Sequence, residues 1–293
     1  MARSSRPRRQ AGESVVWGRP KLLALLAATI AVVMLLVTGL VLVVIDAIGT
    51  SSSNTSASGS STRGSVQDDG REVVGQATGG HGDGKAAGEV TARDRLADQP
   101  MTAVLESASH PAPVSLTDPG RPIVLPPSTG TGSAGVPSGY PHTAEGALAQ
   151  LAAIDQTALG SGSLAGVRAV IAGWALPGGP TTSSWSGVQA MARLLTAAGL
   201  SGGGSPQLAI IATPLMGLIK GTVGTDLVVP CINLELDVTL ASTARGAVAD
   251  CQRMVWQAGR WWIGPGPEPA VAPSVWPDSD LAIQVGYRDL RRG

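Results

Sequence analysis

An uncharged, mostly apolar run at residues 22–45 constrains this chain more than any other feature. As a helix, its 24 residues would rise about 36 Å, against roughly 30 Å of bilayer hydrocarbon. Residues 1–21 carry six Arg and Lys and one Glu, and basic residues collect on the cytoplasmic side of a membrane span. We expect a cytoplasmic basic segment at 1–21, a single transmembrane helix at 22–45 and an extracytoplasmic remainder.

A cleaved signal peptide is the alternative for this run. Its apolar core normally spans about 7–15 residues and precedes a small-x-small cleavage site. The run here is longer, and Ile45-Asp46-Ala47 is a poor site. These features favour an uncleaved anchor in the cell membrane.

The next segment, residues 46–139, contains no aromatic residue and is rich in Gly, Ser and Pro. Such a composition offers too little apolar surface to offset the entropy lost on ordering. It predicts a disordered linker between the membrane and a globular extracytoplasmic domain at 140–293.

Helical periodicity begins after Tyr140. Thr143 is a suitable N-cap, and apolar residues then recur at helical spacing around Leu151 and Ile154. A second helix is expected to end at Trp174, and a third to run from about Ser184 to the glycines that start at residue 199.

The second half of the domain shows strand patterns. Apolar and polar residues alternate from Ile232 to Leu240, which predicts a half-buried strand. Further strands are expected at 207–213, 247–257 and 260–263, followed by a C-terminal helix at about 279–290. Three helices followed by a four-stranded antiparallel sheet make an α+β fold.

The two cysteines, Cys231 and Cys251, lie on either side of the turn expected at 242–246, in a compartment that permits disulfides. A turn centred near residue 244 would place Cys251 opposite residue 237, so a bridge requires a β-bulge or a shifted turn. Two free buried thiols and a functional pair are the alternatives.

Catalytic and metal-binding residues are not evident. The three histidines, His81, His110 and His142, lie in the linker or at its end, and no cluster with metal-ligand spacing can be drawn. Formal net charge is zero and no basic run stands out in the domain, which argues against direct nucleic-acid binding. The sequence therefore predicts no catalytic residues, no cofactor and no metal, and a protein that is not an enzyme.

Two further groups of residues were considered as sites. Glu235 and Asp237 share a strand face and could form an acid pair, although a solvated face is favoured. Five tryptophans could line a ligand pocket or fill the core: Trp174, Trp256, Trp261, Trp262 and Trp276. Core packing is favoured, because a chain without Phe has few other large apolar side chains.

Short sequence segments at the two ends of the domain resemble those of a known group of proteins. Gly139-Tyr140-Pro141-His142-Thr143-Ala144-Glu145-Gly146-Ala147 opens the domain, and Ser274-Val275-Trp276-Pro277-Asp278-Ser279-Asp280 with Gly286-Tyr287-Arg288 closes it. They resemble membrane proteins of actinobacterial integrative and conjugative elements. The plan is also similar to bitopic type IV secretion assembly factors and to Mce-associated membrane proteins, which implies a cone-like domain of the cystatin-like or nuclear-transport-factor-like kind.

The resemblance implies a non-enzymatic membrane scaffold or assembly subunit of a conjugative transfer or secretion complex, with other envelope subunits as partners. Homo-oligomer formation stays open at this stage. The alternative is a membrane-anchored module that binds a lipid or an envelope metabolite in an apolar pocket.

Overall fold

The structure is a computed structural model, and it describes residues 83–293. The predicted cytoplasmic segment and transmembrane helix, and the first part of the predicted linker, lie outside these residues. Within them, no helix combines the length and hydropathy needed to cross a bilayer.

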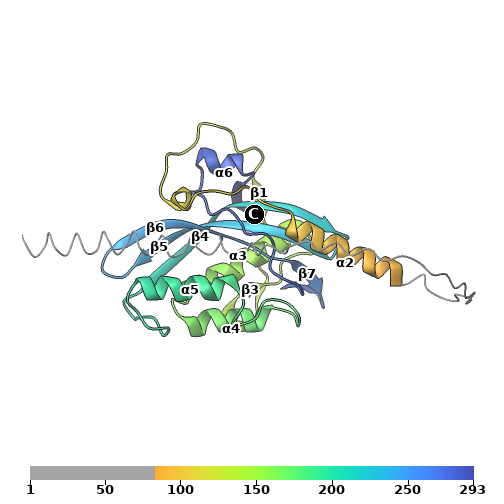
Figure 1. Cartoon of the computed structure of the whole chain (residues 1–293), viewed down its shortest axis with the longest axis horizontal. Coiled ribbons are helices and arrows are strands. Elements are labelled where there is room, and N and C mark those ends of the chain that lie inside the picture. The colour runs from red at the N-terminus through yellow and green to blue at the C-terminus, as the bar shows by residue number, and fades with distance from the viewer. Residues whose placement is uncertain (1–82) are drawn as a thin grey trace, which may run out of the picture. The chain divides into compact units, whose positions relative to one another are not determined.

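The described chain is a mixed α+β fold built on a curled sheet of seven strands (Figure 1). The strands follow the order β1-β9-β4-β5-β7-β8, and β6 pairs with β5 beside β7. Their bounds are β1 Ile123–Leu125, β4 Ala209–Val223, β5 Leu227–Thr239, β6 Thr243–Cys251, β7 Met254–Gln257, β8 Arg260–Ile263 and β9 Arg288–Arg292.

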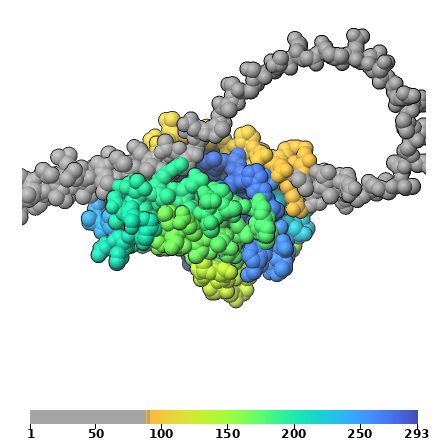
Figure 2. Space-filling view, turned by 60° about the horizontal axis from the view of Figure 1, so that its bottom comes forward, coloured from red at the N-terminus to blue at the C-terminus, as the bar shows by residue number. Residues whose placement is uncertain are grey.

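Helices cover both faces of this sheet. One face carries α3 (Ala144–Gly160), α4 (Leu164–Trp174) and α5 (Ser186–Ala197), and Figure 2 shows the surface on this side of the molecule. The opposite face carries η2 (Glu106–Ser109) and α6 (Asp280–Gln284), while α2 (Asp83–Asp98) contacts the far part of β4.

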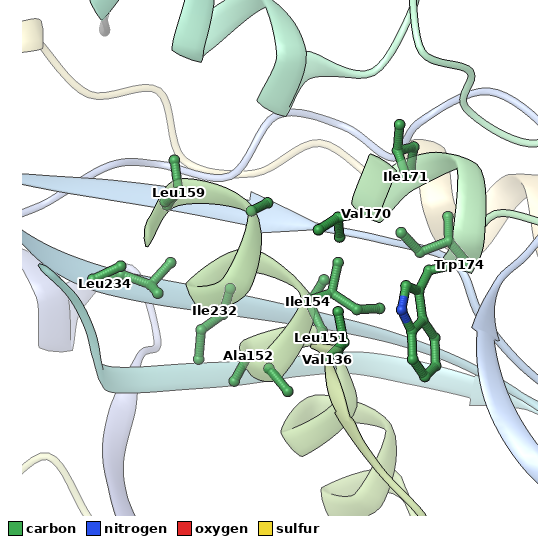
Figure 3. Close-up of a cluster of buried hydrophobic side chains, with 14 of the residues drawn as sticks. Val136, Leu151, Ala152, Ile154, Leu159, Val170, Ile171, Trp174, Ile232 and Leu234 are labelled. Atoms are coloured by element: carbon green, nitrogen blue, oxygen red, sulfur yellow. The ribbon is translucent and has the colours of Figure 1, made fainter. Parts of the chain in front are cut away.

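The central element of the core is α3. The Thr143 side chain accepts a hydrogen bond from the Gly146 amide at 3.1 Å, which confirms Thr143 as the N-cap. Residues of α3 are buried on nearly every side, because the sheet lies on one side and α4, α5 and β3 (Pro137–Ser138) lie on others. Figure 3 shows Leu151 and Ile154 of α3 facing Ile232 of β5 and Trp174 of α4.

The alternating pattern in β5 is only partly reflected in burial. Residues 235–239 are partly exposed except for Leu236, as a half-buried strand requires, but every residue from 227 to 234 is buried. Asn233, expected on the solvent face, is fully buried and donates from Nδ2 to the Val275 carbonyl at 2.8 Å. The Pro-rich segment around Val275 covers the face that the pattern assigned to water.

The sheet is larger than the four strands expected, and the C-terminal helix predicted at about 279–290 is confirmed only for its start. That region forms the short α6 and then β9, which pairs with β1 in parallel and with β4 in antiparallel fashion. Gly286, at φ +96°, ends the helical turn in a conformation that favours glycine. Beyond it, Leu290 pairs with Ile123 across β1.

The expectation of a disordered linker reaching residue 139 is also wrong for residues 83–139. Besides α2, η2 and β1, this stretch contains η3 (Ser133–Gly135) and a hairpin of β2 (Gly130–Thr131) with β3 (Pro137–Ser138). Ala97, Ile123 and Val136 are buried. The composition of a segment indicates only how much apolar surface the segment could bury by itself. The few apolar side chains here are buried because they pack against a surface that the rest of the domain provides.

Candidate functional site

A cavity of about 780 Å³ lies along β6. Among the described strands β6 pairs with β5 alone, and all its residues from Ala244 to Cys251 line the cavity. Because side chains alternate between the faces of a strand, the cavity extends around the unpaired edge of β6. We call it the edge cavity. Residues 100–106 and 268–274 bound it together with α3, α5 and β5.

Three carboxyl groups meet on the side of the edge cavity that faces the helices. Asp155 projects from α3, and Asp250 of β6 is paired with Ile232, a core residue of β5. Glu268 comes from the segment after β8, where Ser186 donates to it from its hydroxyl at 2.6 Å and its amide at 3.0 Å.

Gln252 connects two of these groups. Its Nε2 donates to the Asp250 carboxylate at 3.0 Å and to Glu268 Oε1 at 3.0 Å. One amide nitrogen therefore holds the two carboxyl groups close together.

Burial and mutual repulsion shift these carboxyl groups toward their neutral forms. Burial raises the pKa of Asp155 well above its ordinary value, and the charges of Asp250 and Glu268 raise it further. Burial and then the charge of Glu268 raise the pKa of Asp250 to about 8, although hydrogen bonds from Gln252 and the Cys251 amide oppose the shift. Every charge acting on these two groups is another carboxylate.

Three residues of the cavity wall, Glu106, Asp155 and Trp185, each have a buried polar atom that lacks a hydrogen-bond partner within the described chain. Asp155 is 4% exposed and its Oδ2 is unpartnered, while Trp185 is 1% exposed and its Nε1 is unpartnered. A buried polar atom without a partner costs about 1–3 kcal/mol. All three residues line the edge cavity, so a molecule held there is the candidate partner for these buried atoms.

The remaining charged residues of the wall are Glu106 of η2 and Arg245 of β6. Arg245 donates from Nε to Glu235 at 3.0 Å and to Asp237 at 3.2 Å. The acid pair considered from the sequence is thus bridged by an arginine on the neighbouring strand. Its arrangement is that of a surface ion-pair network.

The five tryptophans do not line the edge cavity. Trp174 and Trp261 are core residues, and Trp276 is buried under Arg245. Trp256 and Trp262 are partly exposed, and the Arg260 guanidinium lies 3.8 Å from the Trp262 ring centroid. The tryptophan that does line the cavity is Trp185, which the sequence analysis did not single out.

His142 belongs to a separate aromatic cluster. Its ring stacks on Trp256 at 4.4 Å between centroids and meets Trp261 edge-on at 5.5 Å. Nε2 lies 3.0 Å from both the Thr225 carbonyl and an Asp226 carboxylate oxygen. These contacts fasten the start of α3 to the β4–β5 turn and to the β7–β8 hairpin.

A disulfide joins Cys231 and Cys251, which are directly opposite each other on β5 and β6. The turn lies between Thr239 and Thr243, so it is centred at residue 241 and not near 244. This shift of three positions brings the cysteines into register without a bulge. Both are buried against Met101 on the face of β6 that points away from α3.

These buried carboxyl groups were not among the site residues expected from the sequence, although the sequence contained two signals for them. Asp155 lies four residues after Leu151 and so falls on an apolar side of its helix. Asp250 is opposite residue 232 in the observed register and would be opposite residue 238 in the expected one. Residues 232 and 238 both face the core, so Asp250 faces the core in either register. Glu268, in a Pro-rich segment, carries no periodic signal.

Among residues 83–293, no group of His, Cys, Asp and Glu has the geometry to hold a metal ion. No protein-family model, curated protein or solved structure is significantly similar to this chain. The edge cavity is therefore interpreted from its own geometry and chemistry.

Asp250→Asn is expected to flatten the dependence of stability on pH. With a pKa of about 8, Asp250 keeps its proton in the folded domain, while the unfolded chain releases it near pH 4. The folded state binds more protons over this window, so stability should fall as pH rises from about 4 to 8. At pH 8 the free energy of unfolding of the variant should exceed that of the wild type. Because the Asp250 side chain is only partly buried, solvent screens the effect and we expect a difference of about 2 kcal/mol.

Urea unfolding at pH 5 and pH 8, followed by circular dichroism, measures this difference. Asp226→Asn is the matched control, since that carboxylate is 55% exposed and lies outside the edge cavity. Equal pH dependence in the wild type and Asp250→Asn would contradict the burial of a neutral carboxyl group.

Proposed function

We propose that this chain is a membrane-anchored, non-enzymatic binding module that holds a small, mainly apolar ligand in the edge cavity. The volume of about 780 Å³ lies within the range of small-molecule sites. The apolar wall of Leu234, Leu236 and Val238 and the few convergent polar groups are typical of such sites. The curled sheet around α3 supports the cone-like arrangement expected from the resemblance.

The observation that carries the proposal is the unpartnered Oδ2 of Asp155, almost fully buried and at the wall of a cavity. Trp185 Nε1 adds an unpartnered donor to the same wall. A structural carboxyl group would be paired within the chain. An acceptor and a donor left open at one cavity favour a ligand that pairs with them.

Native mass spectrometry of the full-length protein, extracted from membranes into lipid nanodiscs, tests this proposal. We expect a small molecule to accompany the wild type. Ala190→Phe places a ring at the cavity wall on α5 and should reduce its occupancy at least about tenfold. Ala192→Phe is the control, because Ala192 lies on the same helix but does not line the cavity.

Two outcomes would contradict the proposal. One is a wild-type protein that carries no small molecule and shows no thermal shift with membrane lipid extracts. The other is equal occupancy in the wild type and Ala190→Phe.

We also propose, as a second function, that the domain serves as a scaffold for other envelope subunits of a transfer or secretion complex. Three apolar side chains, one directly before η2 and two between η2 and β1, favour it, since Leu105, Val114 and Leu116 are each more than two-thirds exposed. A photo-crosslinking residue at Leu116 should capture a membrane partner, and one at the exposed Thr196 of α5 should not. Equal capture at both positions, or at neither, would contradict the scaffold.

A further inference from the structure

The charge of the edge cavity narrows the class of ligand. Four carboxyl groups line it: Glu106, Asp155, Asp250 and Glu268. Arg245 is the only cationic side chain among its lining residues, and Glu235 and Asp237 bind its guanidinium. The acids come from four separate elements, namely η2, α3, β6 and the segment after β8. The α5 wall adds neutral groups, including Ser186 and Gln189.

The polar atoms left without partners are mostly acceptors. Asp155 Oδ2 and Glu106 Oε1 are buried and unpartnered acceptors of lining residues, and Trp185 Nε1 is an unpartnered donor. An anionic ligand would find no uncommitted cation among the described lining residues, and an uncharged apolar ligand would leave these acceptors unsatisfied. A cation with N–H groups would satisfy them and offset the repulsion between the carboxylates.

The apolar part of the ligand has its own surface. Leu234, Leu236, Val238 and Leu159 line the cavity, and Leu105 and Val271 extend this apolar surface outward, at 79% and 60% exposure. A molecule with one charged end and one hydrocarbon end fits both parts of the wall.

We infer that the edge cavity binds a cationic amphiphile, an organic ammonium with a hydrocarbon chain, whose charged nitrogen lies among Asp155, Asp250 and Glu268. This assignment rests on the proposed binding function and specifies its ligand class. Because Asp155 and Asp250 hold protons in the free protein, binding of the ammonium releases about one proton to solvent at neutral pH.

Calorimetry with three probes of equal chain length tests the inference: octylamine, 1-octanol and octanoate. Each is titrated into the full chain in phosphatidylcholine nanodiscs at pH 7, and protein-free nanodiscs correct for uptake by the lipid. We expect octylamine to bind at least about tenfold more tightly than 1-octanol, because hydrogen bonds to charged groups exceed neutral ones by about this factor. Titration in two buffers of different ionisation enthalpy should show the released proton.

Variants that replace a carboxyl group by an amide distinguish the effect of charge on binding from the effect of cavity shape. Asp155→Asn and Asp250→Asn should each remove most of the preference for octylamine, while Asp226→Asn should keep it, since Asp226 pairs with His142 outside the edge cavity. If either cavity variant fails to fold, Glu268→Gln replaces it, and proton release by the wild type remains a separate readout.

The outcomes distinguish this inference from the function on which it rests. Equal binding of octylamine and 1-octanol, or tighter binding of octanoate, would overturn the cationic class and leave a binding cavity in place. A wild type that binds none of the three probes would overturn both. Preference for octylamine without proton release, or unchanged in both aspartate variants, would place the nitrogen elsewhere and overturn the assignment.

Discussion

Trp174→Ala lowers the free energy of unfolding by about 3–5 kcal/mol, the usual cost of removing a large aromatic side chain from a core. Trp174 is fully buried at the end of α4, where it lies close to Leu151 and Ile154 of α3 (Figure 3). Its Nε1 donates to the Ser133 carbonyl at 3.0 Å. The variant therefore leaves a cavity and also an unpaired carbonyl.

The same change is expected to loosen residues 130–138. A Cβ on Gly132 would lie 2.5 Å from the Trp174 ring, so the ring and this backbone are in close contact. Urea unfolding measures the global loss, and hydrogen exchange of amides 130–138 measures the local one. Trp262→Ala is the control, because that ring is partly exposed and should cost less. A loss below about 1 kcal/mol for Trp174→Ala would contradict its place in the core.

Replacing both cysteines, in Cys231→Ala/Cys251→Ala, is expected to lower the free energy of unfolding by about 3 kcal/mol. The disulfide closes a loop with a sequence separation of 20 residues, and a cross-link of this span removes about that much loop entropy from the unfolded chain. It also ties β5 to β6, whose other edge faces the cavity. Urea unfolding of the oxidised wild type and the double variant gives the difference.

Adding a reductant distinguishes the contribution of the disulfide bond to stability from that of the packing of the two side chains. The wild type in dithiothreitol should approach the double variant, and the variant itself should not respond to the reagent. Thiol alkylation of native protein without reductant should label neither cysteine. Two labelled thiols in native protein, or equal stability of the oxidised and double-variant forms, would contradict the bridge.

Local patterns predicted much of the domain. The N-cap at Thr143, the helix that ends at Trp174 and the strand of residues 260–263 are confirmed, because each depends on neighbours within one or two turns or on a short alternation. The register of β6 was not predictable, since moving the turn by three residues changes every cross-strand pair while the same residues still face the core.

The chemistry of the site depended on information of a different kind. Asp155 and Asp250 were within reach of sequence reasoning, because one lies on an apolar helix face and the other faces the core in either register. Glu268 and Trp185 were not, because nothing local brings the segment after β8 to the start of α5. The tryptophans chosen for their type turned out to lie in the core or in surface clusters.

The sequence by itself determined the helices within residues 143–197 and the strand that contains residues 232–239, since these follow from propensity, capping and periodicity along the chain. The membrane anchor at 22–45 stays a prediction, because it lies outside the described residues. Tertiary structure alone decided that residues 83–139 pack onto the domain, that residues 288–292 form a strand, and that four acids line one cavity along β6. Those outcomes depend on surfaces built by residues far away in the chain. The sequence of a segment that packs against such a surface does not need a regular apolar pattern of its own, so the packing cannot be predicted from that segment alone.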